Sequence, residues 1–303
     1  MGIAPALLEF GRVRIFPTRE GKKYRDHGAR RRYLLPGWER EPGHGKLVAM
    51  GTAIEFENVS YEVAPSHVLL SEISLAVAEG TTTAILGRSG SGKTTLLRTV
   101  NRMIEPTSGA VLLRGRDVRG GDVTGLRRGI GYVIQESGLF PHFTVERNVG
   151  VVMEAMGRPR AERRRRCGEL LELVGLDAGG LGGRFPHQLS GGQRQRVGLA
   201  RALAAEPGIL LMDEPFGALD PLTRGEMQDM LRGLLKRLKK TVLLVTHDLD
   251  EALYLADRIV LMSEGRLAAH LAAEEFLGSK QAEVTAYVRA FRRGSRGAEG
   301  EER

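Results

Sequence analysis

The stretch GRSGSGKTT, Gly87 to Thr95, decides the fold. It fits the phosphate-loop pattern G-x-x-x-x-G-K-[ST], and it lies where that loop requires, after an apolar run and at the start of a helical pattern. In such a loop backbone N–H groups surround phosphate oxygens, Lys93 places its charge on the β- and γ-phosphates, and Thr94 offers its hydroxyl to Mg²⁺. A glycine-rich turn without a ligand is the weaker alternative, because a chance match in this setting is rare. The stretch predicts a nucleoside triphosphate site formed by Gly87, Arg88, Ser89, Gly90, Ser91, Gly92, Lys93, Thr94 and Thr95.

Short apolar runs alternate with helical patterns around this loop. Most of the runs are apolar throughout rather than at every second position, as expected for parallel strands that are covered on both faces. One intervening helix is marked by Asp220, a capping residue, followed by Pro221. Alternation of this kind is typical of a three-layer α/β core. The predicted strands lie at 81–87, 129–135, 208–215, 241–248 and 257–262.

The alternation breaks between about Pro141 and Ala204, where the sequence is almost wholly helical. We therefore predict an α/β fold, a P-loop NTPase three-layer core with an antiparallel β edge and an inserted α-helical subdomain. The predicted boundaries are 54–140 and 205–270 for the core, 141–204 for the helical subdomain, and 271–303 for a short C-terminal helix and charged tail.

The first 53 residues have a different composition from the rest. Residues 1–50 hold eleven Lys and Arg against five Asp and Glu, so they carry +6 of the net charge of +8. The remainder is nearly charge-balanced, which weakens a nucleic-acid partner. The segment 1–53 is predicted to be a disordered basic extension or, because Met50 precedes the first ordered-looking stretch, the product of a start codon assigned too early. A tether to acidic membranes is a further alternative.

Composition restricts the class of protein. No run approaches the 18 or so apolar residues that would suggest a membrane span, and no basic start followed by an apolar stretch indicates a secretory signal. Cys167 is the only cysteine, so an internal disulfide is excluded and a reducing cytosol is favoured. We read Cys167 as an ordinary helix residue rather than a reactive thiol.

The run ILLMDEP ends in two adjacent carboxylates, Asp213 and Glu214. At the carboxyl edge of a parallel sheet, Asp213 can reach the magnesium shell, and Glu214 can polarise a water for in-line attack on the γ-phosphate. Paired acids alone are a weak signal, since most are surface caps. Directly after a buried strand, in a chain with a phosphate loop, they predict a metal ligand and a catalytic base.

Three further residues are candidates by position. His247 ends an apolar strand and could hydrogen-bond the γ-phosphate, although a lone histidine is usually structural. Gln135 ends another strand and could hold the metal or the attacking water. Tyr61 lies in a short strand-like piece before the loop and could stack on adenine, with core packing as its rival.

The stretch LSGGQRQRVGLARALAAEP, 189–207, predicts a second anion site. Ser190 and the following glycines present a hydroxyl and backbone N–H groups at the start of a helix, where the dipole also favours anions. This site should lie on the helical insertion, away from the phosphate loop. This second anion site has no phosphate loop and no lysine of its own. That is explained if it completes a nucleotide site on another molecule. Its candidate residues are Ser190, Gly191, Gly192 and Gln193.

At these residues the chain resembles the ATP-binding subunit of ABC transporters. It has LSGGQ at 189–193, Walker A at 87–94, Walker B at 209–214, GALD at 217–220 and the switch histidine, and the resemblance covers roughly 54–270. The resemblance implies that two ATPase subunits join head to tail and enclose two ATP molecules with Mg²⁺. The two subunits are either identical copies or this chain and a different ATPase subunit. It implies that Glu214 is the catalytic base, that Gln135 couples to the permease, and that Asp220 contacts the partner subunit.

Finer resemblance is to the subfamily that imports osmoprotectants such as glycine betaine, choline, carnitine or proline. It implies an integral membrane permease, a solute-binding protein as an indirect partner, and a peripheral position at the cytoplasmic face of the membrane. Many members carry C-terminal sensing domains, for which residues 271–303 are too short. An importer of another small solute, such as an amino acid or related betaine, is the alternative.

Two other classes of protein fit the sequence less well. A soluble ABC ATPase acting on DNA or ribosomes would carry two ATPase domains or a long coiled coil, and the sequence shows neither. A catalytically dead binding module conflicts with the residues present at the catalytic positions. Residues 136–149, which follow Gln135 and border the helical insertion, are predicted to form the groove for a cytoplasmic helix of the permease.

Overall fold

The computed structural model describes residues 51–64 and 67–298, with side chains described up to Arg293. The predicted extension therefore lies outside the described residues, except that the first strand already begins at Thr52. Within the described residues, no helix combines the length and apolar character needed to cross a membrane.

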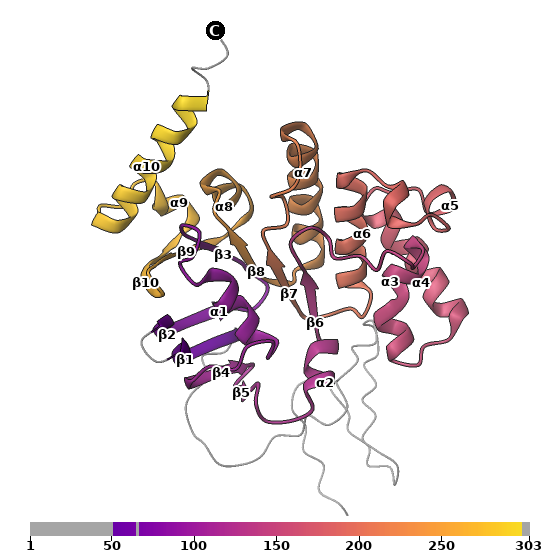
Figure 1. Ribbon diagram of the computed structural model, residues 1–303, viewed down its shortest axis with the longest axis horizontal. Helices are drawn as coiled ribbons and strands as arrows, with labels where there is room; N and C mark the ends of the chain where they lie inside the picture. Colours follow the sequence, from indigo (N-terminus) through magenta and orange to yellow (C-terminus); the bar gives the residue numbers. More distant parts are fainter. Residues whose placement is uncertain (1–50, 65–66, 299–303) are drawn as a thin grey trace, which may run out of the picture. The chain divides into compact units, whose positions relative to one another are not determined.

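A six-stranded sheet forms the centre of the described domain (Figure 1). All five predicted strands belong to it, and they run parallel to one another. Its inner strands are buried along their whole length, because helices cover both faces, and most of their side chains are apolar. The strands, in sheet order, are β10 (Arg266–Ala272), β9 (Arg258–Ser263), β3 (Thr82–Leu86), β8 (Thr241–Thr246), β7 (Ile209–Asp213) and β6 (Ile130–Val133).

The predicted antiparallel β edge corresponds to two features of the structure. β10 pairs antiparallel with β9 at the edge of the central sheet. A separate four-stranded sheet is also antiparallel, with each strand paired to its neighbour in that sense. Its strands, in sheet order, are β2 (His67–Ala78), β1 (Thr52–Ala64), β4 (Ser108–Leu113) and β5 (Arg116–Asp117).

Helices occupy both faces of the central sheet, which completes the predicted three-layer core. α1 (Lys93–Val100) packs between β4 of the antiparallel sheet and β7 and β8 of the central sheet. α7 (Pro221–Leu238) and α8 (Leu249–Leu255) bury their apolar side chains with those of β3, β7 and β8. Asp220 caps α7 and Pro221 stands at its first position, as predicted. α2 (Val123–Arg128) precedes β6.

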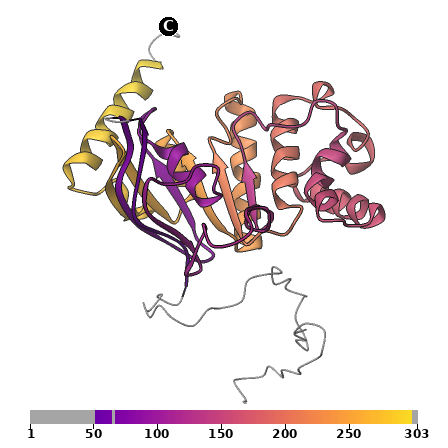
Figure 2. The same ribbon diagram turned by 60° about the horizontal axis from the view of Figure 1, so that its bottom comes forward.

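Every element between β6 and β7 is helical, and these helices gather beside β6 in both views (Figures 1 and 2). α6 bridges this group and the core, since it packs on α3, α4, α7 and β6. The boundaries drawn at 141–204 for a helical subdomain remain a prediction. The helices are α3 (Val145–Ala155), α4 (Arg160–Leu173), α5 (Ala178–Leu181), the 3₁₀ turn η1 (Pro186–Gln188) and α6 (Gly191–Leu203).

Two helices end the chain after β10. α9 (Ala273–Phe276) is short, and α10 (Ala282–Ala298) is the C-terminal helix expected in 271–303. Apolar residues of both, Phe276, Val284 and Val288, pack into the same cluster as residues of β3, β9 and α8. The C-terminal helix is therefore packed into a cluster that also holds residues of the strand leading into the phosphate loop.

Candidate functional site

The phosphate loop connects β3, which ends at Leu86, to α1, which begins at Lys93. The ammonium of Lys93 is buried in the loop and donates to the carbonyls of Gly87 and Arg88, at 2.9 and 2.8 Å. Burial lowers the pKa of Lys93, and the nearby carboxylates of Glu214 and Asp213 oppose that shift. The loop therefore holds a positive charge at its centre, close to two carboxylates.

The backbone of the loop leaves room for an anion. Gly92 has φ +94°, and a Cβ there would lie 2.6 Å from the carbonyl oxygen of Leu69, so only glycine fits. Gly90 faces open space, with no atom within 4 Å of a Cβ. The Ser91 hydroxyl is buried without a hydrogen-bond partner. A phosphate would satisfy such a hydroxyl, and the cradle thus fits a phosphorylated ligand.

Two of the three candidate metal ligands, Thr94 and Asp213, come together at the carboxyl end of β7. The Thr94 hydroxyl donates to Oδ1 of Asp213 at 2.7 Å. Asp213 is buried and closes β7. In the described part of the chain no three His, Cys, Asp or Glu side chains gather as a metal site. The hydroxyl and carboxylate suit Mg²⁺, which binds proteins through one or two carboxylates and takes its other ligands from phosphates and water.

Glu214 and His247 lie side by side, each directly after one of the neighbouring strands β7 and β8. Oε1 of Glu214 is 3.4 Å from Nδ1 of His247, whose side chain is exposed. Glu214 has φ +46°, an unusual value for a residue with a side chain, and its N–H donates to the carbonyl of Val245. Strain of this kind is common at functional sites. A small cavity of about 30 Å³ adjoins the pair, lined by Glu214, Gly217, Arg224, Thr246, His247, Asp248 and Glu251.

The second cradle is the start of α6. Ser190 is the N-cap: its hydroxyl accepts from the N–H of Gln193 at 3.2 Å, and the Gln193 side chain accepts from the N–H of Ser190 at 3.0 Å. The N–H groups of Gly191 and Gly192, in the first turn, have no partner within the helix. A Cβ on Gly191 would meet its nearest neighbour at 3.8 Å, whereas one on Gly192 would lie 2.5 Å from the Thr223 methyl. The cradle adjoins the start of α7.

Comparison with known proteins agrees with the resemblance to ABC transporters. A family model described as ABC transporter matches residues 70–217. The glycine betaine uptake system ATP-binding protein YehX of Escherichia coli (strain K12) is 47% identical over 214 residues, which are 71% of this chain and 69% of that protein. The chain belongs to the ABC transporter family. The domain it contains is a nucleotide-binding ATPase domain.

The choline transport ATP-binding protein OpuBA of Bacillus subtilis (strain 168) is 46% identical over 214 residues, 71% of this chain and 56% of that protein. The chain spans about half to two thirds of the length of such curated relatives. Among solved structures, a dimeric post-hydrolysis state of the ATP-binding cassette MJ0796 with ADP and Pi matches with a TM-score of 0.66 and 33% identity, over 73% of this chain and 98% of that one.

The structure shows where the remaining predicted site residues lie. Their contacts do not reveal a role in binding or catalysis. Gln135 follows β6, next to β7 in the sheet, and its side chain is exposed. Tyr61 is half-buried in β1, opposite Leu70 of β2. Asp220 caps α7 by accepting from the N–H of Thr223 at 3.0 Å, a bond that lowers its pKa. Of the loop residues, Arg88 and Ser89 are exposed and Thr95 is half-buried. Their ligand roles remain predictions.

Two residues that contact Asp213, Tyr132 and Arg98, belong to none of the ABC motifs and were not predicted from the sequence. The Tyr132 hydroxyl donates to Oδ2 of Asp213 at 3.3 Å and accepts from Arg98 at 3.4 Å, and the Arg98 guanidinium lies 3.6 Å from the same carboxylate oxygen. Burial raises the pKa of Tyr132, so this hydroxyl keeps its proton and can donate. The only sequence signal for Tyr132 is a polar group in the middle of an otherwise apolar strand.

Proposed function

We propose that this chain hydrolyses ATP in a dimer, with each ATP enclosed between the phosphate loop of one subunit and the start of α6 of the other. The observation that carries the proposal is the second cradle. It offers a hydroxyl and free N–H groups at a helix start, and its closest neighbours belong to the start of α7 rather than to the phosphate loop. In a dimer, the ATP bound by the phosphate loop of the other subunit would be the ligand of this cradle. A dimeric cassette bound to ADP and Pi, among the similar solved structures, supports the proposal of a dimer.

In the proposed reaction, the phosphate loop and Lys93 bind and orient the phosphates. Thr94 and Asp213 hold Mg²⁺, which when bound neutralises charge on the phosphate oxygens. Glu214 takes a proton from the attacking water as the water oxygen bonds to the γ-phosphorus and the bond to the β–γ bridging oxygen breaks. ADP leaves with that electron pair, and phosphate is the second product.

Four further side chains complete the proposed site. His247, beside Glu214, contacts the γ-phosphate and senses its loss. Gln135 holds the metal or the attacking water and reports the state of the site to the permease. Tyr61 stacks on adenine, and Asp220, at the start of α7, contacts the partner subunit.

A concentration series of the full chain tests the dimer. Activity per subunit is expected to rise with protein concentration, because a monomer holds only half of each site. Replacing Ser190 with Arg should abolish ATP-dependent dimerisation and turnover while leaving ATP binding to the monomer intact, which serves as the internal control. A strictly monomeric preparation that turns over at the full rate would overturn the proposal.

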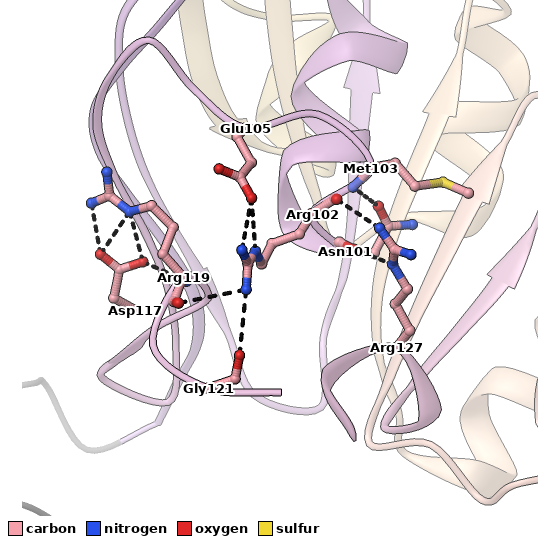
Figure 3. Close-up of polar contacts among 8 residues, drawn as sticks. All are labelled: Asn101, Arg102, Met103, Glu105, Asp117, Arg119, Gly121 and Arg127. Atoms are coloured by element: carbon pink, nitrogen blue, oxygen red, sulfur yellow. Dashed lines mark hydrogen bonds and ion pairs between the residues drawn. The ribbon is translucent and has the colours of Figure 1, made fainter. Parts of the chain in front are cut away.

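We also propose that the dimer powers an integral membrane permease and lies peripherally at the cytoplasmic face of the membrane. A cavity of about 210 Å³ offers a docking place. Arg127 of α2 holds one wall of it by donating to the carbonyls of Asn101 and Arg102 after α1 (Figure 3). Its lining includes Asn101, Met103, Arg127, Arg128, Tyr132, Val152 and Arg201.

The predicted groove segment 136–149 is attached to this cavity. Arg201, which lines the cavity, donates to the carbonyls of Ser137 and Gly138 at 2.8 and 2.7 Å. Met103 and Phe140 are exposed apolar side chains in the same part of the domain, as a helix-binding groove requires. Glu136→Lys or Phe140→Ala should uncouple transport and leave the ATPase activity of the isolated subunit largely intact. If both activities fell together, the groove assignment would be wrong.

For the solute we propose an osmoprotectant such as glycine betaine, choline, carnitine or proline, delivered to the permease by a solute-binding protein. The proposal relies on the named relatives, because this subunit has no contact with the solute. The test is uptake of labelled glycine betaine by vesicles containing this subunit and a permease that it binds. Uptake of an amino acid instead, with no competition from quaternary amines, would favour the alternative importer and contradict the osmoprotectant assignment.

A further inference from the structure

The C-terminal helix α10 reaches the nucleotide site through one tyrosine. The Tyr287 hydroxyl donates to the backbone carbonyl of His247 at 3.0 Å, across 40 residues of sequence. None of the ABC motifs includes this helix, which follows the matched region 70–217. The contact is thus an addition to the site already described.

The helix is firmly placed for such a contact. Val284 and Val288 are buried with Leu249 and Ala252 of α8, and Tyr287 packs against the same cluster. Burial raises the pKa of Tyr287 to about 12, so the hydroxyl keeps its proton at neutral pH and donates. The apolar anchors hold α10 on α8, the helix that follows His247 directly.

The residues on either side of His247 are fixed by bonds within their own segment. The Thr246 hydroxyl donates to Glu251 at 2.6 Å and accepts from the N–H of Asp248 at 3.0 Å. Asp248 caps α8 by accepting from the N–H groups of Asp250 and Glu251. Tyr287 supplies the hydrogen bond to the carbonyl of His247 from outside the segment. A shift of that carbonyl would carry the His247 side chain away from Glu214.

We infer that Tyr287 is a positioning residue for the ATPase reaction: from α10 it holds the backbone of His247 so that the imidazole stays beside Glu214. The inference rests on the proposed role of His247. It makes the C-terminal helix part of the catalytic machinery, because turnover depends on a bond that no other element of the described structure provides to this carbonyl.

Steady-state kinetics of Tyr287→Phe in the full chain tests the inference. The variant keeps the ring and its packing and loses only the hydroxyl. We expect kcat to fall about 3- to 10-fold, as for one lost neutral hydrogen bond, with KM for ATP changed less than about 2-fold. Tyr254→Phe is the matched control, since it removes a hydroxyl that bonds Asp229 from α8 and does not touch His247; its kcat should equal that of the wild type.

A double-mutant cycle separates positioning from general stability. With His247→Ala, the imidazole is gone, so adding Tyr287→Phe should lower kcat no further. An unchanged kcat in Tyr287→Phe would overturn the inference, as would a double variant in which the two losses multiply. A His247→Ala variant with normal turnover would instead refute the proposed role of His247 itself, and the tyrosine would then have no imidazole to position.

Discussion

The two helix starts that open α1 and α6 make an instructive comparison. At α1, Gly92 has a left-handed backbone and a crowded side-chain position, while Lys93 and the unpartnered Ser91 hydroxyl supply charge and a donor. At α6, Ser190 and Gln193 satisfy each other in a capping box, and the first turn carries no lysine. The first start is therefore built to bind a phosphate anion, whereas the second is stable alone and offers only the N–H groups that its cap leaves unpaired.

This difference predicts that the two starts fail in different ways when altered. Damage at the first should impair binding of ATP to a single subunit. Damage at the second should spare that binding and impair only what requires two subunits. Glu214 is proposed to act after ATP has bound, in the hydrolysis step itself. Its replacement should therefore have the largest effect on turnover.

Glu214→Gln is expected to lower kcat by about 10²- to 10⁴-fold, the usual loss for a positioned general base. The amide keeps the shape of the carboxylate but cannot take the proton from water. ATP binding should persist and the dimer should accumulate. Phosphate release measures the first effect, and light scattering of the ATP-bound protein measures the second. Near-normal turnover would remove Glu214 from its proposed role.

Lys93→Ala and Ser190→Ala compare the two starts directly. Loss of the ammonium should weaken ATP binding to the monomer by about 10- to 100-fold, because a charge-assisted bond to phosphate is removed. Ser190→Ala should leave that affinity unchanged, lower turnover, and cost about 1 kcal/mol of stability as a lost helix cap. Titration with a fluorescent nucleotide and thermal unfolding report these quantities.

Thr144→Ala is the control for Ser190→Ala. Thr144 caps α3 in the same way, accepting from the N–H of Arg147 at 3.3 Å, so its loss reproduces the capping penalty away from either cradle. If the two variants lost equal stability but also equal turnover, the special place of Ser190 would be refuted.

The adjacent glycines of the second start predict a smaller contrast. Gly191→Ala should leave thermal stability almost unchanged, because its Cβ would be 3.8 Å from the nearest atom, and should lower turnover by crowding the open side of the cradle. Gly192→Ala should lower Tm by about 2–4 °C, since its Cβ would press on the Thr223 methyl at the start of α7. Equal Tm values for the two variants would contradict this reading of the cradle.

Local sequence sufficed for the fold but not for every contact in the site. The five strands of the central sheet could be predicted because each is a short apolar run, a property that neighbouring residues reveal. Thr94 and Asp213 lie together as sheet-edge logic expects, although their metal-binding role remains a prediction. Tyr132 and Tyr287 could not be selected, because their hydroxyls meet Asp213 and His247 only after distant segments have docked.

Glu251 provides the smallest predicted effect, and it tests the cavity beside Glu214. Its carboxyl is buried, and burial raises its pKa above the usual 4.5, opposed by the bond from Thr246 and supported by the charge of Asp248. The folded state then binds the proton more tightly than the unfolded state. Its contribution to stability is complete below about pH 4.5 and declines as pH rises through the folded-state pKa.

Replacing Glu251 with Gln removes this titration while the amide oxygen still accepts from Thr246. The Tm of the variant relative to wild type should therefore rise as the pH is raised above about 4.5. Glu275→Gln, at an exposed glutamate of α9, is the control for removing a carboxylate outside the cavity. A relative Tm for Glu251→Gln that stayed flat or fell over this range would mean that the carboxyl is ionised at no cost in the fold. The cavity would then be wet enough to solvate a charge, and the water next to Glu214 would exchange freely with solvent rather than being held for attack.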